Sequence, residues 1–194
     1  KQGFLPELME KMYTERVVYK KKAIEAKKEY QKTKDPIYQN EISRCHNIQM
    51  AKKISLNSAY GAIGNQYFRY FDVKQAEAIT LGGQLSIRWV ERDVNRFMNK
   101  LLGTDNKNYV VASDTDSIYL KLDTLVEKVC KGKSTKQIVD FLNKAAEDKI
   151  QKVIDDSYQN LAHYVNAYQQ KMIMKREAIA NKGIWVAKKR YMMN

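Results

Sequence analysis

The sequence predicts an α+β fold in which a long antiparallel helical hairpin precedes a second unit with an antiparallel β-hairpin and packed helices. The first observation is a pair of long helical stretches of similar length, separated by the Lys-Asp-Pro break at residues 34–36. The second is the change after Gly103 from helical periodicity to short β-prone runs. The third is a composition ordinary for a globular protein, with 44% hydrophobic and 29% charged residues.

Two helices are expected first. Residues 4–31 contain no Gly or Pro after Pro6 and many good helix formers, which favours a helix. Proline disfavours helical backbone at the residue before it, so the chain should turn at residues 34–36. A second helix is expected over residues 37–57, and the short connection predicts that the two helices lie antiparallel. We assign this helical hairpin to a first unit, residues 1–70.

A second unit, residues 71–194, is expected to follow. Gly61 and Gly64 loosen the helical pattern before it, and Gly103 ends its first helix. Two β-prone runs then flank an acidic Ser-Asp-Thr-Asp-Ser segment, which predicts a β-hairpin with carboxylates at its tip. The elements expected in this unit are a helix over 74–102, strands over 109–112 and 118–122, a helix over 135–168, and strand-like runs over 171–179 and 184–193.

The chain is strongly basic, with a formal net charge of +13. An excess of this size favours a polyanionic partner, because neutralised phosphates release counterions, although lysine-rich helices can also be solvated faces and no more. No stretch approaches the ~18 apolar residues of a membrane span. Cys45 and Cys130 are isolated and lack metal-binding spacing. We therefore expect a protein of a reducing, cytoplasmic compartment with no membrane partner.

The acidic segment is the first candidate site. Asp114 and Asp116 are two residues apart, so on extended chain both carboxylates would project from one face. Paired carboxylates repel each other unless a cation neutralises them, and hard oxygen ligands suit Mg²⁺. On spacing alone a plain turn is the better explanation, because Ser, Asp and Thr are common turn residues. The β-prone flanks and the basic chain around an acidic tip favour the metal site.

Cationic side chains of the helical hairpin form the second candidate site. Arg16 and Lys20 are four residues apart and share one helix face. If the chain turns near residue 35, positions whose numbers sum to about 70 lie at one level along the α-helical rise, which brings Lys53 beside Arg16. Three cations at one level suit a triphosphate. A solvated charged face explains the three residues about equally well.

Three motifs resemble those of family B DNA polymerases. Residues 53–61, Lys-Ile-Ser-Leu-Asn-Ser-Ala-Tyr-Gly, resemble the Lys-x-x-x-Asn-Ser-x-Tyr-Gly motif of the fingers. Residues 113–117, Ser-Asp-Thr-Asp-Ser, resemble the Asp-Thr-Asp-Ser catalytic hairpin of the palm, with Ser113 where Gly is usual. Residues 188–191, Lys-Lys-Arg-Tyr, resemble the basic element that grips primer-template. The order of the motifs matches the family, and the general pattern is similar to members from T-even-like bacteriophages.

The resemblance implies a fold, a cofactor and a role for each candidate residue. The helical hairpin would be the fingers and residues 71–194 part of the palm, with Mg²⁺ as cofactor. The implied roles are metal binding by Asp116 and, more weakly, Asp114; triphosphate binding by Arg16, Lys20 and Lys53, supported by Asn57; lining of the base-pair pocket by Tyr60; primer-template contact by Lys188, Lys189 and Arg190; and positioning of the primer end by Tyr191. Glu177 is a further candidate carboxylate of the palm.

The family also needs a second metal-binding Asp, in an Asp-x-x-Ser-Leu-Tyr-Pro-like motif before the fingers. This sequence does not contain that motif. The resemblance therefore implies DNA-templated DNA synthesis by a piece of a split or longer polymerase that is inactive as the isolated chain. The implied partners are primer-template DNA, dNTP and the remaining polymerase segments, including the exonuclease domain, the first palm segment and the thumb. A sliding clamp is a further candidate partner.

Other classes of function stay open at this point. A non-catalytic DNA- or nucleotide-binding module would keep the basic surface and tolerate the loss of Asp114 and Asp116. A structural helical interaction domain would carry its charge for solubility and would show no salt-dependent DNA binding. The order of the three motifs argues against this structural domain. RNA-templated synthesis ranks lower, because its usual acidic hairpin differs from residues 113–117.

Overall fold

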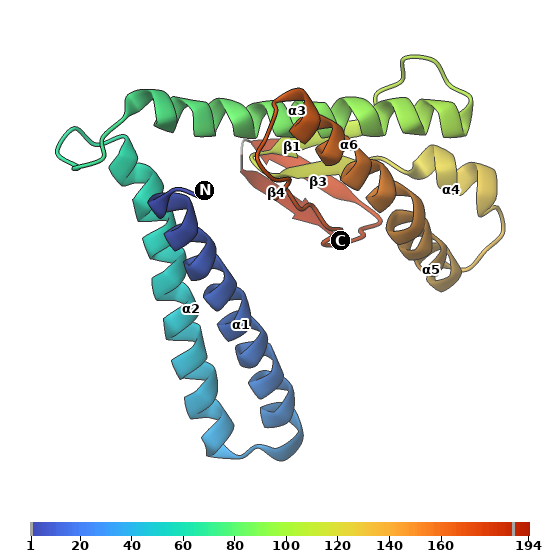
Figure 1. The fold of residues 1–194 in the computed structure, drawn as a ribbon. Helices are drawn as coiled ribbons and strands as arrows, with labels where there is room; N and C mark the ends of the chain where they lie inside the picture. Colours follow the sequence, from blue (N-terminus) through green and yellow to red (C-terminus); the bar gives the residue numbers. More distant parts are fainter. Residues whose placement is uncertain (1, 188) are drawn as a thin grey trace. The chain divides into compact units, whose positions relative to one another are not determined.

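The chain consists of two compact units, residues 1–79 and residues 80–194 (Figure 1). The computed structural model describes residues 2–187 and 189–194. Helices dominate both units, and each of the two sheets in the described residues is a two-stranded antiparallel hairpin. The α+β class predicted from the sequence is therefore confirmed. Among the described residues, no helix is both long enough and apolar enough to cross a membrane.

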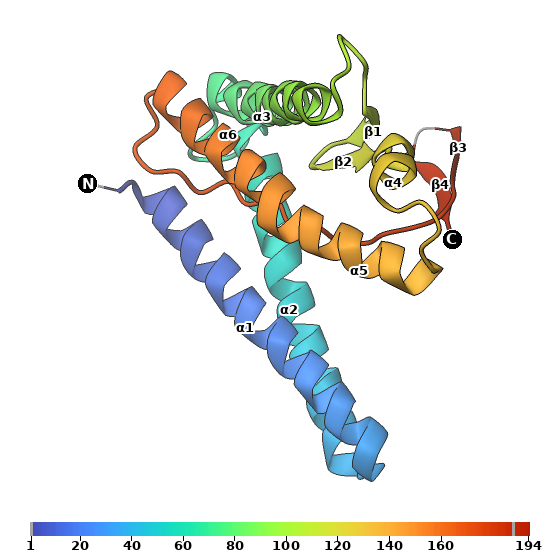
Figure 2. The same ribbon diagram turned by 90° about the vertical axis from the view of Figure 1, so that its right-hand side faces the viewer.

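The first unit is a helical hairpin of α1 (Phe4–Thr33) and α2 (Pro36–Ile63), which run antiparallel side by side in both ribbon views (Figures 1 and 2). Lys34 ends α1 in the left-handed conformation, with φ 58°, and its N–H donates to the Tyr30 carbonyl. The Asp35 carboxylate caps α2 by accepting the N–H of Ile37 at 2.9 Å. Pro36 then occupies the first helical position, where its missing N–H costs nothing.

Helix α2 is longer than the predicted span of 37–57, because it continues through Gly61 to Ile63. Glycine inside a helix costs only about 1 kcal/mol relative to alanine, and interhelical packing can offset that cost. The two helices bury the small side chains of Ala26 and Cys45, so their backbones can approach closely. The Sγ of Cys45 donates to the Glu41 carboxylate, and burial raises the pKa of this thiol.

An ion pair between Glu15 on α1 and Lys52 on α2 joins the two helices. The hydrogen bond and the positive charge of Lys52 lower the pKa of the Glu15 carboxyl group. Because the folded-state pKa lies below the unfolded value of ~4.3, the pair stabilises the fold above that pH. The stabilisation is lost as the pH falls through the folded-state pKa of Glu15.

Lys52→Met should therefore weaken the helical hairpin at neutral pH and have little effect in acid. We expect the urea midpoints for loss of helicity in the wild-type and variant chains to differ at pH 7 and to converge near pH 3. Lys27→Met, which removes an exposed lysine of α1, is the matched control and should leave both midpoints in place. An equal difference at the two pH values would show that the ion pair does not cause the effect.

The second unit is built on the C-terminal part of α3 (Val73–Leu102). Its buried residues recur every four positions, at Val90, Val94, Met98 and Leu102, and therefore lie on one helix face. The other elements of the unit are β1 (Val110–Asp114), β2 (Ser117–Leu120), α4 (Asp123–Val129), α5 (Thr135–Ala145), a π-helical segment (Ala146–Ile150), α6 (Gln151–Tyr164), β3 (Gly183–Ala187) and β4 (Arg190–Met193).

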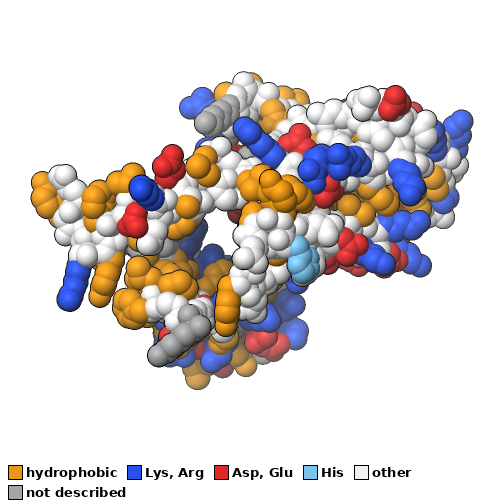
Figure 3. All heavy atoms as spheres, turned by 45° about the horizontal axis from the view of Figure 1, so that its top comes forward, with side chains coloured by type: hydrophobic (Ala, Val, Ile, Leu, Met, Phe, Trp, Pro, Cys, Tyr) orange, Lys and Arg blue, Asp and Glu red, His pale blue; other side chains and the backbone are white. Residues whose placement is uncertain are grey.

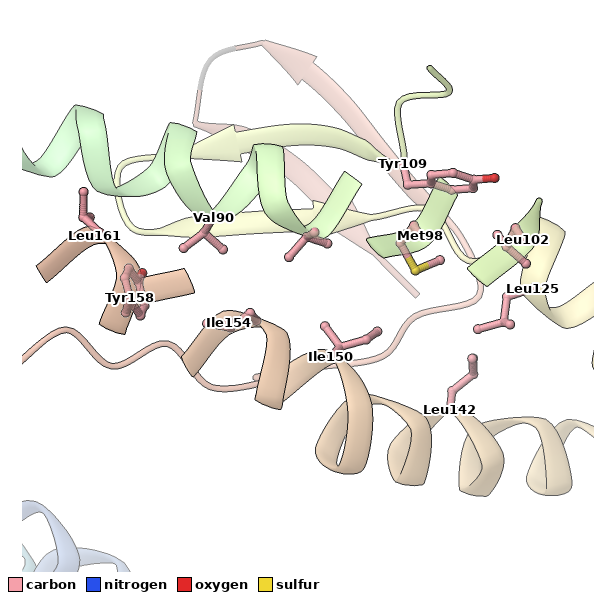
Figure 4. Close-up of a cluster of buried hydrophobic side chains, with 11 residues drawn as sticks. Val90, Met98, Leu102, Tyr109, Leu125, Leu142, Ile150, Ile154, Tyr158 and Leu161 are labelled. Carbon is pink, nitrogen blue, oxygen red and sulfur yellow. The ribbon is translucent and has the colours of Figure 1, made fainter. Parts of the chain in front are cut away.

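One hydrophobic core joins the helices of this unit (Figure 4). In the close-up, side chains from α3 face side chains from α5, the π-helical segment and α6, and Leu125 of α4 closes one end. Tyr109, which is 1% exposed, enters the core just before β1, and its hydroxyl lies 2.8 Å from the Thr104 hydroxyl. Lys121 N–H donates to the Tyr109 carbonyl beyond β2. The β1–β2 hairpin is therefore fixed to the core at its base.

The later part of this unit differs from the sequence prediction. The helix expected over 135–168 ends at Tyr164 and is interrupted by the π-helical segment, and α4 was not expected. Residues 171–179 form no strand; Gln151 Nε2 holds them to α6 by donating to the Met174 carbonyl at 2.8 Å. The run over 184–193 is two strands that pair with each other, because the chain reverses at Lys189 with φ 63°.

Candidate functional site

Asp114 and Asp116 lie at the tip of the β1–β2 hairpin. Asp114 ends β1 opposite Ser117, and the chain reverses through Thr115, whose φ is 55°. Asp116 N–H donates to the Asp114 carbonyl at 2.6 Å, which closes a three-residue turn. Asp116 therefore lies in the turn and not on extended strand, so the expectation from strand alternation was wrong. The tight turn is what keeps the two acidic residues close.

The two carboxylates have different surroundings. The Asp114 carboxylate is half-buried and accepts the Thr115 hydroxyl at 2.9 Å. Asp116 is exposed, and its carboxylate has no hydrogen-bond or ion-pair partner among the described residues. Burial, followed by the negative charge of Asp116, raises the pKa of the Tyr158 hydroxyl on α6. The tip thus presents carboxylate oxygens that no cation of the described residues neutralises. Such oxygens are the ligands that Mg²⁺ prefers.

The ligand set of a metal site is only partly present at this tip. Nowhere in residues 2–187 and 189–194 do three His, Cys, Asp or Glu side chains gather closely enough to hold a metal ion. Asp114 and Asp116 supply oxygen atoms of the type that fits Mg²⁺, which commonly completes its coordination with water and substrate phosphate. The donor chemistry therefore fits the ion, with two carboxylates from this chain.

Three aromatic side chains connect this hairpin to the β3–β4 hairpin. The Tyr119 ring lies 5.2 Å from the Trp185 ring and 5.3 Å from the Tyr191 ring, both in edge-on contact. Trp185 and Tyr191 stack at 6.4 Å. A shallow pocket of about 130 Å³ lies beside them and is lined by Ala112, Ser113, Asp114, Tyr119, Trp185, Ala187, Lys189 and Tyr191.

The hydroxyl group of Tyr191 forms a hydrogen bond within this aromatic cluster. Its hydrogen bond with Tyr119 raises the pKa of Tyr191, and burial and the carboxylates of Glu177 and Asp114 add to the shift. Tyr191, which the sequence singled out, therefore lies beside the acidic tip, where it lines a pocket together with Asp114. Glu177, the further candidate carboxylate, acts on Tyr191 through its charge. Tyr119 and Trp185 were missed, because nothing in one sequence distinguishes them from aromatic residues that fill a strand.

The basic element lies on the same hairpin as Tyr191. Lys189 forms the turn between β3 and β4 and lines the pocket together with Asp114, and Arg190 begins β4. Both side chains are exposed. Lys188 lies outside the described residues. The structure therefore brings the acidic segment and part of the basic element together around one pocket.

The candidate residues of the helical hairpin belong to the other unit. Glu15 and Lys52 lie side by side in an ion pair, so their chain neighbours Arg16 and Lys53 lie near one level of the hairpin, with Lys20 one helical turn further along. The Nε of Arg16 is buried and has no partner among the described residues. Lys20, Lys53, Asn57 and Tyr60 are exposed. A larger hollow of about 390 Å³ on this hairpin is lined by other residues, among them Val18, Tyr19 and Ile48.

Comparisons with known proteins identify the class. The model of DNA polymerase family B matches residues 1–161, and the chain belongs to that family. The β3–β4 hairpin lies beyond the matched residues.

Two curated relatives are phage enzymes. The DNA-directed DNA polymerase of Escherichia phage RB69 is 42% identical over 156 residues, which cover 75% of this chain and 17% of the relative. The DNA-directed DNA polymerase of Enterobacteria phage T4 is 41% identical over 156 residues, with the same coverage. The chain thus spans about a sixth of the length of the relatives it matches.

Proposed function

We propose that this chain carries part of the active site for DNA-templated DNA synthesis, in which a nucleotide is transferred from dNTP to a primer 3′-hydroxyl. The observation that supports this most strongly is the packing of the acidic hairpin against the basic β3–β4 hairpin through Tyr119, Trp185 and Tyr191. Because the chain belongs to DNA polymerase family B, the carboxylates of this site would bind metal and the basic hairpin would bind DNA phosphates.

In this proposal the helical hairpin is the fingers and residues 71–194 form part of the palm. Asp114 and Asp116 would hold Mg²⁺, which when bound activates the attacking oxygen and stabilises the leaving oxygen. Lys189 and Arg190, with Lys188, would bind primer-template phosphates, and Tyr191 would orient the primer end. The hydrogen bond between Tyr191 and Tyr119 helps to hold the Tyr191 phenol in place, and Tyr191 lines the same pocket as Asp114.

The triphosphate of dNTP would bind the fingers at Arg16, Lys20 and Lys53, with Asn57 beside them and Tyr60 near the nascent base pair. Arg16 supports this assignment, because its guanidinium has no hydrogen-bond or ion-pair partner among the described residues. The Nε is buried, so a triphosphate would contact the terminal nitrogens. Cations placed against a triphosphate contribute electrostatic stabilisation to phosphoryl transfer.

The second metal-binding Asp would come from a palm segment outside residues 1–194. The remaining polymerase segments are therefore proposed partners, together with primer-template DNA, dNTP and a sliding clamp. The small share of the relatives' length that this chain covers supports this view.

The test is Mg²⁺-dependent primer extension by this chain alone and after mixing with the remaining polymerase segments, including the one with the Asp-x-x-Ser-Leu-Tyr-Pro-like motif. We expect extension only in the mixture. Extension by the chain alone would show that another carboxylate of this chain completes the site. Absence of extension from a folded, associated mixture would instead favour a DNA-binding module without catalytic activity.

Arg16→Ala should raise the KM for dNTP about 10- to 100-fold in the active mixture, since a hydrogen bond to a charged group contributes ~1.5–3 kcal/mol. The measurement is single-nucleotide incorporation at varied dNTP concentration. Lys27→Ala, which removes another cation from α1, should leave the KM unchanged. Equal increases in the two variants would mean that general charge, and not a triphosphate contact, sets the KM.

A further inference from the structure

A row of four cations runs along the exposed face of α3. Arg88, Arg92, Arg96 and Lys100 follow one another at intervals of four residues and are all exposed. Four residues of α-helix rise about 6 Å, so the row extends over roughly 18 Å. Val90, Val94 and Met98 on the opposite face are fully buried. We call these four cations the α3 ridge; it faces away from the core that supports the acidic hairpin.

The ridge keeps most of its charge. Asp93 is its nearest carboxylate, accepting Arg92 Nε at 3.0 Å and lying 3.8 Å from Arg96. The second oxygen of Asp93 accepts the Ser157 hydroxyl at 2.8 Å. Within the described part of the chain, Arg88 and Lys100 have no hydrogen-bond or ion-pair partner. Asp93 is therefore the carboxylate that pairs with the ridge among the described residues, while Glu91 lies on the same helix between Arg88 and Arg92 without an ion pair to them. The four cations outnumber these two carboxylates, and the terminal nitrogens of Arg92 stay available to a ligand.

Aromatic rings lie beside the ridge. The Arg92 guanidinium lies over the Trp89 ring, 4.1 Å from its centre. The Tyr164 ring, at the end of α6, contacts Trp89 at 5.0 Å with a 38° tilt, and Tyr164 is 71% exposed. The Nε1 of Trp89 is buried without a partner among the described residues, so its ring is held by packing and not by a hydrogen bond. Figure 3, with the top of Figure 1 forward, shows Lys and Arg side chains gathered with hydrophobic ones over the part of the molecule that contains α3.

We propose that the α3 ridge binds single-stranded nucleic acid, with phosphates along Arg88, Arg92, Arg96 and Lys100 and an unpaired base stacked on Tyr164. Guanidinium groups pair with phosphate oxygens through their planar forks. Cations combined with exposed aromatic rings are the recurring chemistry of single-strand binding. An acidic protein partner would use the charge but not the exposed ring.

The chain contains two tryptophans, and only Trp89 lies beside the ridge. In a Trp185→Phe chain, fluorescence therefore reports on the ridge. We expect oligo(dT) or oligo(U) of about 16 nucleotides to quench Trp89 saturably. Four phosphate contacts predict that the logarithm of the affinity falls with the logarithm of salt concentration with a slope of about −2 to −3.

Variants separate a specific surface from general charge. In the Trp185→Phe background, the double variant Arg88→Glu, Arg96→Glu should weaken oligonucleotide binding at least about tenfold. These two positions are chosen because their replacement leaves the Arg92–Trp89 contact in place. Lys131→Glu with Lys136→Glu makes the same charge change near the start of α5 and should alter the affinity less than about twofold. Labelled-oligonucleotide anisotropy with both tryptophans present measures total binding, including any at Lys189 and Arg190, and should show a larger loss for the ridge pair than for the control pair.

Three results would overturn the proposal: no quenching of Trp89, equal weakening by the two charge-reversal pairs, or equal affinity for oligo(dT), duplex DNA and poly-glutamate. The proposed polymerase function is tested separately. Asp116→Asn should leave Trp89 quenching unchanged, and in a Trp89→Phe chain Trp185 reports on the pocket beside Asp114. Failure of the ridge and failure of the active site thus give different results.

Discussion

Asp116→Asn should reduce Mg²⁺-dependent primer extension by the assembled polymerase at least about a thousand-fold. A catalytic metal supplies several kcal/mol of charge stabilisation in the transition state, and ~4 kcal/mol corresponds to a factor of about 1,000. Asn keeps the size of Asp but removes the negative charge. Because the Asp116 side chain is exposed and has no partner among the described residues, the substitution should not alter folding. Single-turnover extension under saturating dNTP measures the effect.

Asp105→Asn is the matched control for this prediction. Asp105 lies exposed in the loop between α3 and β1, and its replacement removes the same charge from the same unit. Extension should stay within about twofold of the wild type, because Asp105 lies outside the acidic tip and distant surface charges are screened at physiological salt. A fall of less than tenfold in Asp116→Asn would contradict the role assigned to Asp116, and Asp114 would then be tested as the main ligand.

Met98→Ala should lower the free energy of unfolding of the second unit by about 2–5 kcal/mol, the range for truncating a fully buried Met, Leu or Ile. The Met98 side chain is fully buried on α3, and it belongs to the same core as Tyr109 and Leu125 (Figure 4). Its loss leaves a cavity beneath the base of the β1–β2 hairpin. Both tryptophans of the chain lie in residues 80–194, so urea unfolding followed by their fluorescence reports on this unit.

The control for Met98→Ala lies on the same helix. Gln84 is exposed on α3, and Gln84→Ala should change the unfolding free energy by less than about 0.5 kcal/mol. If Met98→Ala were as stable as the control, the core of Figure 4 would not hold α3 against α5 and α6. As the temperature is raised, Met98→Ala should lose primer extension over the same range in which its second unit unfolds. This range should lie below that of the wild type, because the acidic tip depends on this core.

Local rules predicted the first half of the fold. Asp35 and Pro36 mark the turn by their own chemistry, one as a capping side chain and one as a residue that cannot continue the preceding helix. The helix that ends before Gly103 follows from the same kind of rule, because Gly103 has φ 60°. These signals act over a few residues, so one sequence contains them in full.

The second half of the fold depends on contacts between residues that lie far apart in the sequence, and local sequence patterns do not contain this information. Residues 171–179 look β-prone but have no strand to pair with, and Gln151 holds them as irregular chain against α6. The reversal at Lys189 was missed, since lysine rarely adopts a positive φ. The same limit applied to the site. Motifs identified the acidic and basic segments, but the aromatic bridge through Tyr119 depends on residues far apart in the sequence.

The left-handed conformation of Thr115 has a consequence for how the acidic tip could evolve. A β-branched residue is unfavourable at φ 55°, and such a conformation persists only when the surroundings enforce it. The hydrogen bonds to the Asp114 carbonyl and carboxylate provide that enforcement. Glycine at this position would relieve the strain but would also widen the range of shapes open to the loop. At this position, glycine would make the turn easier to form, whereas threonine restricts the loop to fewer conformations. Threonine therefore fixes the positions of the two carboxylates more narrowly, at the cost of backbone strain.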